Sequence, residues 1–356
     1  MTEFSLKTKI ISGAGSVAQL KTLESKRLLL VSDPYFSQNG TAQAILTCSG
    51  AAQTAVFDQV IPDPSVELVA EGVALMRQFC PDTVVALGGG SAMDCAKAMA
   101  YFAGGDIRLV MIPTTSGSGS EVTDFAVLTH GTTKHPLVDK KLLPDLAILD
   151  SDLLQSLPKT LIADAGFDVL GHALEAFVAM GAGNITDALA KEAFSTVFHL
   201  LAESFRGNGA VRGQLHLAAT MAGMAFSQAG LGLCHALAHA LGAAYHIPHG
   251  RLIAILLPAV IDCNAPVCGE KYALLARATG LPGVSDTLAV RNLKNGLIRL
   301  RKNLNLPDTL QAAGVKNVDV EVVVKTALAD PCCQTNPVKP DQSLVQRVLE
   351  AVTGRE

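Results

Sequence analysis

Tryptophan is absent from this 356-residue chain, aromatic residues make up only 4 % of it, and charged residues make up only 17 %. Its 28 lysines and arginines are outnumbered by 32 aspartates and glutamates, and they form no basic cluster. Proteins that bind nucleic acid need clustered basic residues to neutralise phosphates, so we expect no nucleic-acid partner. Hydrophobic residues make up 49 % of the chain, which is enough material for large buried cores.

Signals for secretion or membrane insertion are also missing. The first residues, MTEFSLK, contain no apolar signal-peptide core, so we expect a cytoplasmic protein. The most apolar run, 217–233, is interrupted by Ser227, Gln228 and several glycines, and the run 252–261 is too short to span a bilayer. We therefore interpret both runs as buried helices and expect no membrane partner.

The eight cysteines form no CxxC pair and have no zinc-ribbon spacing. We therefore expect reduced and mostly buried thiols. Cys332 and Cys333 are adjacent, and we interpret this pair as packing within a loop.

The first 150 residues alternate between short apolar runs and segments with helical spacing. The runs 27–33, 83–87 and 108–112 are typical of buried strands, whereas 65–80 and 92–102 have helical spacing. Continuous apolar strands separated by helices predict a parallel sheet that is covered on both faces.

The pattern changes near Asp150. From Asp152 onward, apolar residues recur at intervals of three and four, alanines are frequent, and strand signals almost vanish. We therefore predict an α/β domain over residues 1–152 and an all-α domain over residues 153–356.

Two glycine-rich loops follow predicted strands in the first domain. Gly88-Gly-Gly-Ser91 precedes a helix, whose free backbone N–H groups can bind a pyrophosphate, although the usual GxGxxG pattern is missing and a tight turn explains the loop equally well. The second loop, 113–123, is rich in serine and threonine hydroxyl groups. Because both loops would meet at the carboxyl ends of parallel strands, they predict a dinucleotide site there.

Asp33 ends an early predicted strand. Its carboxylate could accept hydrogen bonds from an adenosine ribose, which would favour NAD over NADP because it would repel a 2′-phosphate. A helix-capping role explains an aspartate at this position equally well.

Four of the nine histidines lie between Ala229 and Gly250, in a segment that is otherwise apolar: His235, His239, His246 and His249. Neutral imidazoles in apolar surroundings are typical of a transition-metal site. Asp168 and His172, four residues apart, lie on one helix face and could grip the same ion or form a simple hydrogen-bonded pair. A carboxylate with imidazoles and no thiolate suits Fe(II) or Zn(II) with one position open for substrate.

Beyond these patterns, nearly the whole chain resembles the iron-containing (group III) alcohol dehydrogenase family. Within that family it is most similar to the propanol and ethanol dehydrogenases of bacterial microcompartment pathways. The resemblance implies a Rossmann-like first domain and a dehydroquinate synthase-like architecture. It is carried by Gly88 to Asp94, Pro113 to Glu121, Gly166 to Glu175, Gly230 to Gly250 and Asp330 to Pro337.

The resemblance also implies roles for individual residues. The metal ligands would be Asp168, His172, His235 and His249, and His239 would act in proton movement, so that the catalytic group comprises His239, Asp168 and His235. His246 matches no ligand position. The cofactor-binding residues would be Asp33, Gly89, Gly90, Ser91, Thr114, Thr115 and Lys134.

The implied activity is reversible hydride transfer between NAD(H) and short primary alcohols or aldehydes, with Fe(II) as the expected metal and Zn(II) as the alternative. A homodimer or larger homo-oligomer, and association with a microcompartment, would be typical of these relatives. One alternative is a zinc-dependent polyol dehydrogenase or a phosphate-eliminating synthase, but a synthase needs basic residues that the motifs lack. Another is a non-catalytic microcompartment component, against which the intact ligand set argues.

Overall fold

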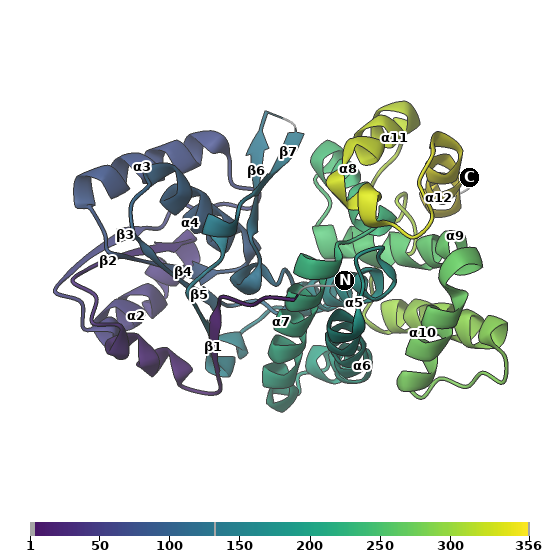
Figure 1. Ribbon diagram of the computed structural model, residues 1–356, viewed down its shortest axis with the longest axis horizontal. Helices are drawn as coiled ribbons and strands as arrows, with labels where there is room; N and C mark the ends of the chain where they lie inside the picture. Colours follow the sequence, from purple (N-terminus) through teal and green to yellow (C-terminus); the bar gives the residue numbers. More distant parts are fainter. Residues whose placement is uncertain (1–3, 132, 355–356) are drawn as a thin grey trace. The chain divides into compact units, whose positions relative to one another are not determined.

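The computed structural model describes residues 4–131 and 133–354, which divide into two compact units at Leu157–Pro158. Residues 5–157 form an α/β unit, and the residues from Pro158 onward, together with Phe4, form a helical unit (Figure 1). The boundary predicted at residue 152 lies in the 3₁₀ turn η4 (Ser151–Leu154), shortly before this division.

The α/β unit contains a six-stranded parallel sheet with strand order β1-β8-β5-β4-β2-β3. The predicted fold class, a parallel α/β unit followed by a helical one, is thereby confirmed. In sheet order the strands are β1 (Lys9–Ser12), β8 (Leu146–Leu149), β5 (Arg108–Pro113), β4 (Thr83–Gly88), β2 (Arg27–Ser32) and β3 (Gln53–Phe57).

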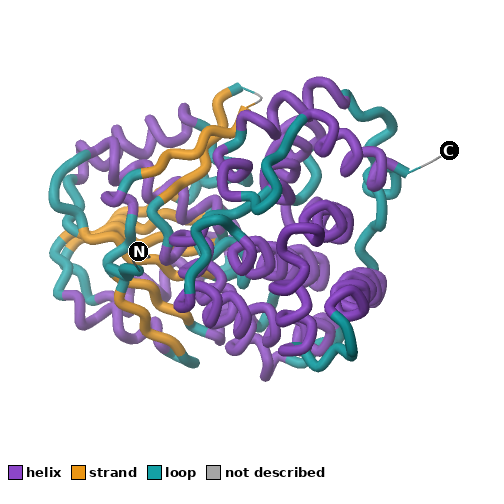
Figure 2. Tube along the Cα trace, turned by 45° about the vertical axis from the view of Figure 1, so that its right-hand side comes forward, coloured by secondary structure: helices purple, strands orange, loops and turns teal. Residues whose placement is uncertain are grey.

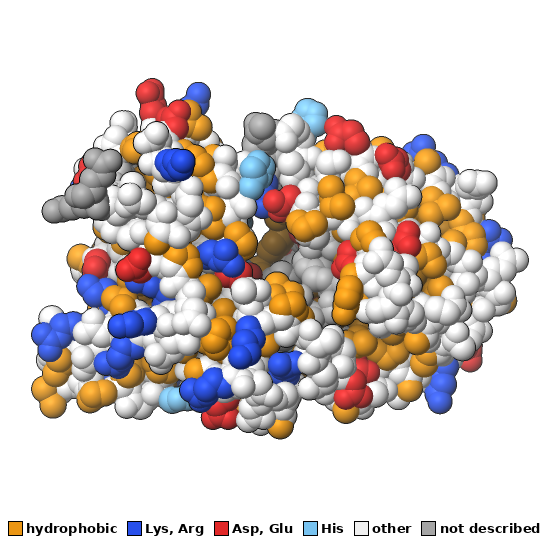
Figure 3. Space-filling model, turned by 180° about the vertical axis from the view of Figure 1, so that it is seen from behind, with side chains coloured by type: hydrophobic (Ala, Val, Ile, Leu, Met, Phe, Trp, Pro, Cys, Tyr) orange, Lys and Arg blue, Asp and Glu red, His pale blue; other side chains and the backbone are white. Residues whose placement is uncertain are grey.

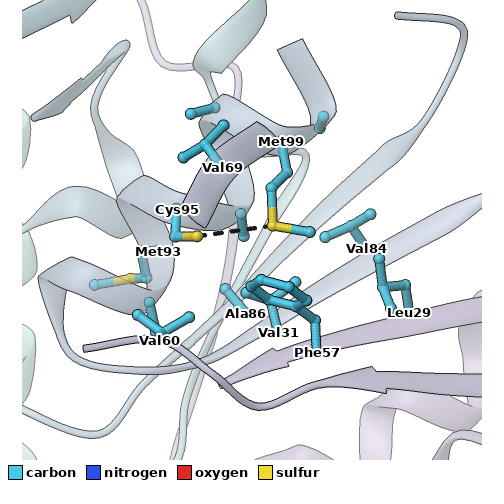
Figure 4. Packing of buried hydrophobic residues seen from close by; sticks show 14 of the residues in the cluster. Leu29, Val31, Phe57, Val60, Val69, Val84, Ala86, Met93, Cys95 and Met99 are labelled. Carbon is cyan, nitrogen blue, oxygen red and sulfur yellow. Dashed lines mark hydrogen bonds between the residues drawn. The ribbon is translucent and has the colours of Figure 1, made fainter. Parts of the chain in front are cut away.

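Helices cover both faces of this sheet (Figure 2), which is why its central strands are apolar at nearly every position. Leu29, Val31 and Val84 point to the face covered by α3 (Val66–Phe79) and α4 (Gly90–Ala103), where Met99 packs close to them (Figure 4). Their sequence neighbours point to the opposite face, which η1 (Ser16–Leu23) and α2 (Thr41–Ser49) cover. Alternation along each strand therefore builds two cores at once.

An antiparallel hairpin, β6 (Phe125–His130) with β7 (Thr133–Val138), stands outside this sheet. The sequence patterns did not predict it. The remaining short elements of the unit are α1 (Pro34–Gln38), η2 (Ser120–Val122) and η3 (Lys140–Leu142).

A fully buried lysine anchors the second glycine-rich loop and the hairpin to α4. The Lys97 ammonium group donates to Ser120 Oγ at 2.9 Å, to both oxygens of Thr123 at 3.0 and 3.1 Å, and to the Phe125 carbonyl at 3.0 Å. The Asp94 carboxylate, one turn earlier, accepts from Ser120 Oγ at 2.7 Å and from Val127 N–H at 2.9 Å. Burial lowers the pKa of Lys97 to about 8, and nearby carboxylates oppose that shift.

Replacing Lys97 by methionine should destabilise the α/β unit by about 3–5 kcal/mol, because the Asp94 charge and several acceptors then stay buried without the cation. Urea unfolding followed by circular dichroism would measure this loss. The control is Lys21→Met on the exposed side of η1, which should change stability little. Equal stability of the two variants would show that the buried network contributes nothing.

The second unit is entirely helical in its described residues. Its elements are α5 (Lys159–Val178), α6 (Asn184–Phe205), η5 (Gly209–Val211), α7 (Arg212–Ala229), α8 (Leu233–Tyr245), α9 (His249–Ala278), α10 (Asp286–Asn303), α11 (Val320–Ala329), η6 (Pro331–Thr335) and α12 (Gln342–Thr353). Helix α5, which packs against α6, α7 and α9, is buried at almost every position from Ile162 to Val178.

Within the described residues, α9 is long and apolar enough to cross a membrane, and the bent pair formed by 209–229 and α8 also meets that criterion if it is counted as one span. The apolar character of α9 is explained by its packing against α5, α8, α10 and α12. More than half of its apolar window, 56 %, is buried inside the protein. Pro258 and Pro266 lie within it, and its backbone is non-helical at Cys268.

Charges of both signs lie on the surface of the protein. Figure 3 shows acidic, basic and apolar side chains interspersed on the face that it draws. Exposed ion pairs such as Lys294–Asp262 at 2.8 Å and Arg277–Asp286 at 2.6 Å place opposite charges side by side. Such pairing weakens the local field that a polyanion would meet.

Candidate metal centre and active site

The three predicted histidine ligands converge on one oxygen of the fourth predicted ligand, Oδ1 of Asp168. It lies 3.3 Å from His249 Nε2, and 3.8 Å from the Nε2 atoms of both His172 and His235. Asp168 and His172 come from α5, His235 from the first turn of α8, and His249 from the first residue of α9. One ligand atom from each of Asp168, His235 and His249 lies within 4.8 Å of the other two.

Within the described residues, Asp168 Oδ1 and His235 Nε2 are buried at this point without a hydrogen-bond partner. Buried polar atoms are nearly always paired, so an unpaired carboxylate oxygen facing an unpaired imidazole nitrogen calls for a cation between them. Burial opposes ionisation of Asp168, but the imidazoles of His172, His249 and His235 hold the pKa of its carboxyl group well below the usual range. The donor set therefore fits Fe(II) or Zn(II).

The ring of His172 is fixed by stacking between two other rings. Its centroid lies 4.3 Å from that of Phe226, on α7, and 4.6 Å from that of His235. The angles between ring planes are 26° and 14°. This stack orients His172 toward Asp168, one turn earlier on the same helix.

Glu175 fixes the orientation of His235, a role that the sequence patterns did not reveal. His235 Nδ1–H donates to Glu175 Oε2 at 2.6 Å, which leaves Nε2 facing Asp168. The same carboxylate accepts from the backbone N–H groups of Gly232 at 2.9 Å and Cys234 at 2.7 Å. It therefore sits at the positive N-terminus of α8, where a buried carboxylate is most stable.

Gly232 is required by this arrangement. A Cβ atom at that position would lie 2.7 Å from Glu175 Oε1 and 2.6 Å from Asn336 Oδ1. Asn336 Oδ1 accepts from Leu233 N–H at 3.0 Å, and its amide pairs with Asn264. The Asn-Pro segment near residue 336 thus supports the start of α8.

A second ion pair ties the start of α9 to α5 and so places His249. Arg251 donates to the Asp164 carboxylate from Nε at 3.2 Å and from Nη2 at 2.9 Å. Gly250 allows this approach, because a Cβ atom there would collide with the backbone carbonyl of Asp164. The distance between Asp168 and His249 therefore depends on the contacts that Gly250 and Arg251 make with Asp164.

His239 lies one turn after His235 but contacts a different carboxylate. Its Nδ1–H donates to Asp330 Oδ2 at 2.8 Å, and its ring stacks on that of His249 with centroids 5.2 Å apart. Burial tends to raise the pKa of Asp330, but hydrogen bonds from His239 and Cys332 lower it to about 2. His246 is outside the cluster and ends α8 in the left-handed conformation, at φ 55°.

The two glycine-rich loops lie against each other in the α/β unit. Thr114 N–H donates to the Gly88 carbonyl at 2.9 Å. A Cβ atom on Gly89 would lie 3.2 Å from Thr115 Oγ1, and one on Gly90 would lie 3.1 Å from Ser118 Oγ. Helix α4 begins at Gly90, so the backbone N–H groups of Gly90 and Ser91 form its N-terminus, beside the second loop.

The other two predicted cofactor residues flank these loops. Asp33 caps α1 by accepting from Tyr35 N–H at 2.9 Å, and its Oδ2 lies 3.8 Å from where a Cβ of Gly88 would be. Asp33 therefore both caps α1 and lies beside the first glycine-rich loop, so the capping role does not exclude a role at the cofactor site. Lys134 pairs with Asp63 at 2.6 Å, and Asp63 N–H in turn donates to Ser91 Oγ at 3.4 Å.

Comparison with known proteins places the chain in a class. Family models match nearly all of it: that of iron-containing alcohol dehydrogenase matches residues 7–151, and that of the Fe-containing alcohol dehydrogenase family, C-terminal, matches residues 162–353. The chain therefore belongs to the iron-containing alcohol dehydrogenase family, and both the predicted family and the predicted class of enzyme are confirmed.

Individual relatives extend over the full chain. It is 40 % identical to the 1-propanol dehydrogenase PduQ of Citrobacter freundii, over 98 % of this chain and 99 % of that protein. It is 37 % identical to an NADPH-dependent butanol dehydrogenase of Clostridium saccharobutylicum, over 99 % and 98 %. The solved structure of sulfoacetaldehyde reductase from Bifidobacterium kashiwanohense in complex with NAD⁺ superposes with a TM-score of 0.92 at 25 % identity, covering both chains fully (100 %).

Proposed function

We propose that this protein is a metal-dependent, NAD(H)-linked alcohol dehydrogenase that interconverts short primary alcohols and aldehydes. The observation that carries the proposal is the pair of unpaired buried atoms, Asp168 Oδ1 and His235 Nε2, within a ring of imidazoles. The ligands are Asp168, His172, His235 and His249, with Fe(II) as the proposed ion and Zn(II) as the alternative. Family membership supports iron.

The chemistry divides between the bound groups and the side chains of this chain. A divalent ion at this site supplies Lewis acidity toward a substrate oxygen, and NAD(H) gives or takes the hydride. Asp168 contributes the negative charge that retains the ion, while Glu175 keeps His235 in the tautomer that presents Nε2.

Alcohol oxidation also releases a proton, and we assign its transfer to His239. Hydrogen bonding of its Nδ1–H to Asp330 leaves Nε2 as the accepting nitrogen. The side chain of His239 is 25 % exposed, so the proton can pass onward to solvent. In aldehyde reduction, the direction we propose for the cell, the same nitrogen delivers the proton.

We assign cofactor binding to residues 1–152 and metal binding and catalysis to residues 153–356. Support for the first assignment comes from the paired loops, in which Gly89, Gly90 and Ser91 open α4 and Thr114 and Thr115 lie against them. Asp33 and Lys134, at the edges of these loops, are assigned to the ribose side of the cofactor.

Replacing Asp33 by serine should shift cofactor preference toward NADPH by about tenfold, equivalent to about 1.4 kcal/mol, because a carboxylate repels a 2′-phosphate. Serine keeps an oxygen for capping α1, so the fold should persist. The ratio of kcat/KM for NADH and NADPH measures the shift. Asp106→Ser is the control. It removes an exposed charge that precedes β5, whereas the second glycine-rich loop follows that strand. An unchanged ratio in Asp33→Ser would remove Asp33 from the ribose site.

An anaerobic NADH-oxidation assay over aldehydes of two to four carbons tests the function as a whole. We expect metal-depleted protein to be inactive and Fe(II) to restore turnover, with Zn(II) loading as the comparison. Full turnover by the depleted protein would refute the proposed chemistry. NADH binding without turnover on any aldehyde would instead favour a non-catalytic component. The family match does not favour the polyol dehydrogenase alternative.

Assembly and location are proposals of the same kind. We propose a cytoplasmic enzyme that associates with a bacterial microcompartment as a homodimer or larger homo-oligomer, as the resemblance to the propanol and ethanol dehydrogenases of such compartments implies. Light scattering of the purified protein, and co-purification with compartment shells, would test the two parts separately.

A further inference from the structure

A second cluster of metal-ligating side chains lies beside the site described above. It consists of His239 on α8, Asp330 at the end of α11, and Cys332 in η6. One ligand atom from each side chain lies within 4.8 Å of the others. None of the three belongs to the ligand set around Asp168.

The side chain of His239 and the backbone N–H group of Cys332 already donate hydrogen bonds to the Asp330 carboxylate. Asp330 accepts from His239 Nδ1–H at 2.8 Å and from Cys332 N–H at 2.8 Å. The side chains of His239 and Asp330 are 25 % and 14 % exposed, so ions can reach them from solvent. The backbone contact with Cys332 holds the Asp330 side chain in place from the far side.

We propose that His239, Asp330 and Cys332 form a second, inhibitory site for a thiophilic divalent ion such as Zn(II) or Cd(II). Imidazole, carboxylate and thiolate are the ligands that Zn(II) prefers, whereas Mg²⁺ and Ca²⁺ prefer sites made of oxygen ligands alone. One water molecule would complete a four-coordinate shell.

The charges of these ligands suit a dication better than those of the first site do. A thiolate together with the Asp330 carboxylate supplies two negative charges, which offset the ion fully. Burial and the nearby Asp330 carboxylate raise the pKa of the Cys332 thiol, so a binding ion must displace its proton. The reaction is therefore the exchange of one thiol proton, released to solvent, for one metal–sulfur bond, with no change of oxidation state. His239 would bind through Nδ1 in the tautomer that carries its proton on Nε2, so the ion replaces the hydrogen bond to Asp330.

Occupation of this site would remove His239 from proton transfer. The ring of His239 stacks on that of His249 and lies 6.4 Å, centroid to centroid, from that of His235. An ion bound to His239 would therefore lie beside the ion of the Asp168 site. It would occupy the imidazole to which we assign proton transfer. Inhibition rests on the proposed function, whereas binding of the ion does not.

The test is a Cd(II) titration of reduced, Fe(II)-loaded Cys80→Ser protein, followed through the ultraviolet absorption of the cadmium–thiolate bond. Cys80→Ser removes the exposed thiol among the eight free cysteines. We expect one equivalent of Cd(II) to bind and the absorption to vanish on adding Cys332→Ser. The matched control is Cys333→Ser, because the adjacent thiol donates to the Ala327 carbonyl at 3.1 Å and is not one of the three ligands. This control should keep the absorption.

Asp330→Asn should weaken Cd(II) binding at least tenfold, and it tests the cluster independently of the cysteine. Absence of the absorption from the parent protein, or its persistence in Cys332→Ser, would overturn the site. Zn(II) should inhibit turnover of the parent protein and inhibit the Cys332→Ser protein at least tenfold less. Binding that depends on Cys332 but leaves turnover intact would confirm the site and refute the proton role of His239.

Discussion

Replacing Asp168 by asparagine should abolish metal retention and turnover together. Asp168 Oδ1 is the atom on which the three predicted histidine ligands converge, and the Asp168 carboxylate supplies the negative charge among these three imidazoles. Asparagine preserves the shape but removes that charge. We expect a loss of turnover greater than the ~10–100-fold that follows when only a hydrogen-bonding partner of a ligand is removed. Metal content per chain after dialysis, measured alongside kcat, gives both results from one preparation.

The matched control is His246→Asn, because it changes a histidine of the same segment outside the cluster. His246 ends α8 at φ 55°, a left-handed conformation that asparagine tolerates better than most residues. This variant should keep its metal and its activity. An Asp168→Asn protein that still held a full complement of metal would contradict the assignment of Asp168 as a ligand.

Three of the four ligand candidates have a local pattern in the sequence, whereas the fourth, His249, is only a histidine that follows Pro248. Asp168 and His172 are four residues apart on one helix, as are His235 and His239. Which histidines belong together is not local. His239 follows His235 by one turn, yet it contacts Asp330, which is 91 residues away in the chain. From the sequence, only the family resemblance assigned His235 and His239 to different roles, as a ligand and as the proton-transfer residue.

The contacts that support the site had no local pattern at all. Lys97 and Arg251 each depend on partners that only tertiary structure brings near. Continuous apolar runs predicted the central strands of the sheet. Strands β1 and β8 have four residues each, which is too few to show a clear hydrophobic pattern in the sequence. The β6–β7 hairpin was missed because it has no continuous apolar run: β6 alternates buried Ala126 and Leu128 with less buried residues, and the sequence of β7 includes Lys134, His135 and Pro136.

Replacing Glu175 by glutamine should lower metal affinity by about 10–100-fold, although Glu175 would never touch the ion. The carboxylate accepts from His235 Nδ1–H and from the N–H groups of Gly232 and Cys234, so both of its oxygens are used. A glutamine side chain has one oxygen, and its NH₂ group would face a donor whichever way it turns. Equilibrium dialysis against Fe(II) or Zn(II) measures the affinity.

The substitution has a second expected effect that separates positioning from folding. Leaving a buried donor without an acceptor costs about 1–3 kcal/mol, so urea unfolding of the metal-free protein should show a loss of that size. Glu192→Gln, the same change at an exposed position of α6, is the control for both measurements. If only stability fell and affinity did not, Glu175 would support the start of α8 without orienting His235. We expect both stability and metal affinity to fall. The two oxygen atoms of Glu175 hold the start of α8 and also fix the tautomer of His235, so the substitution affects both functions.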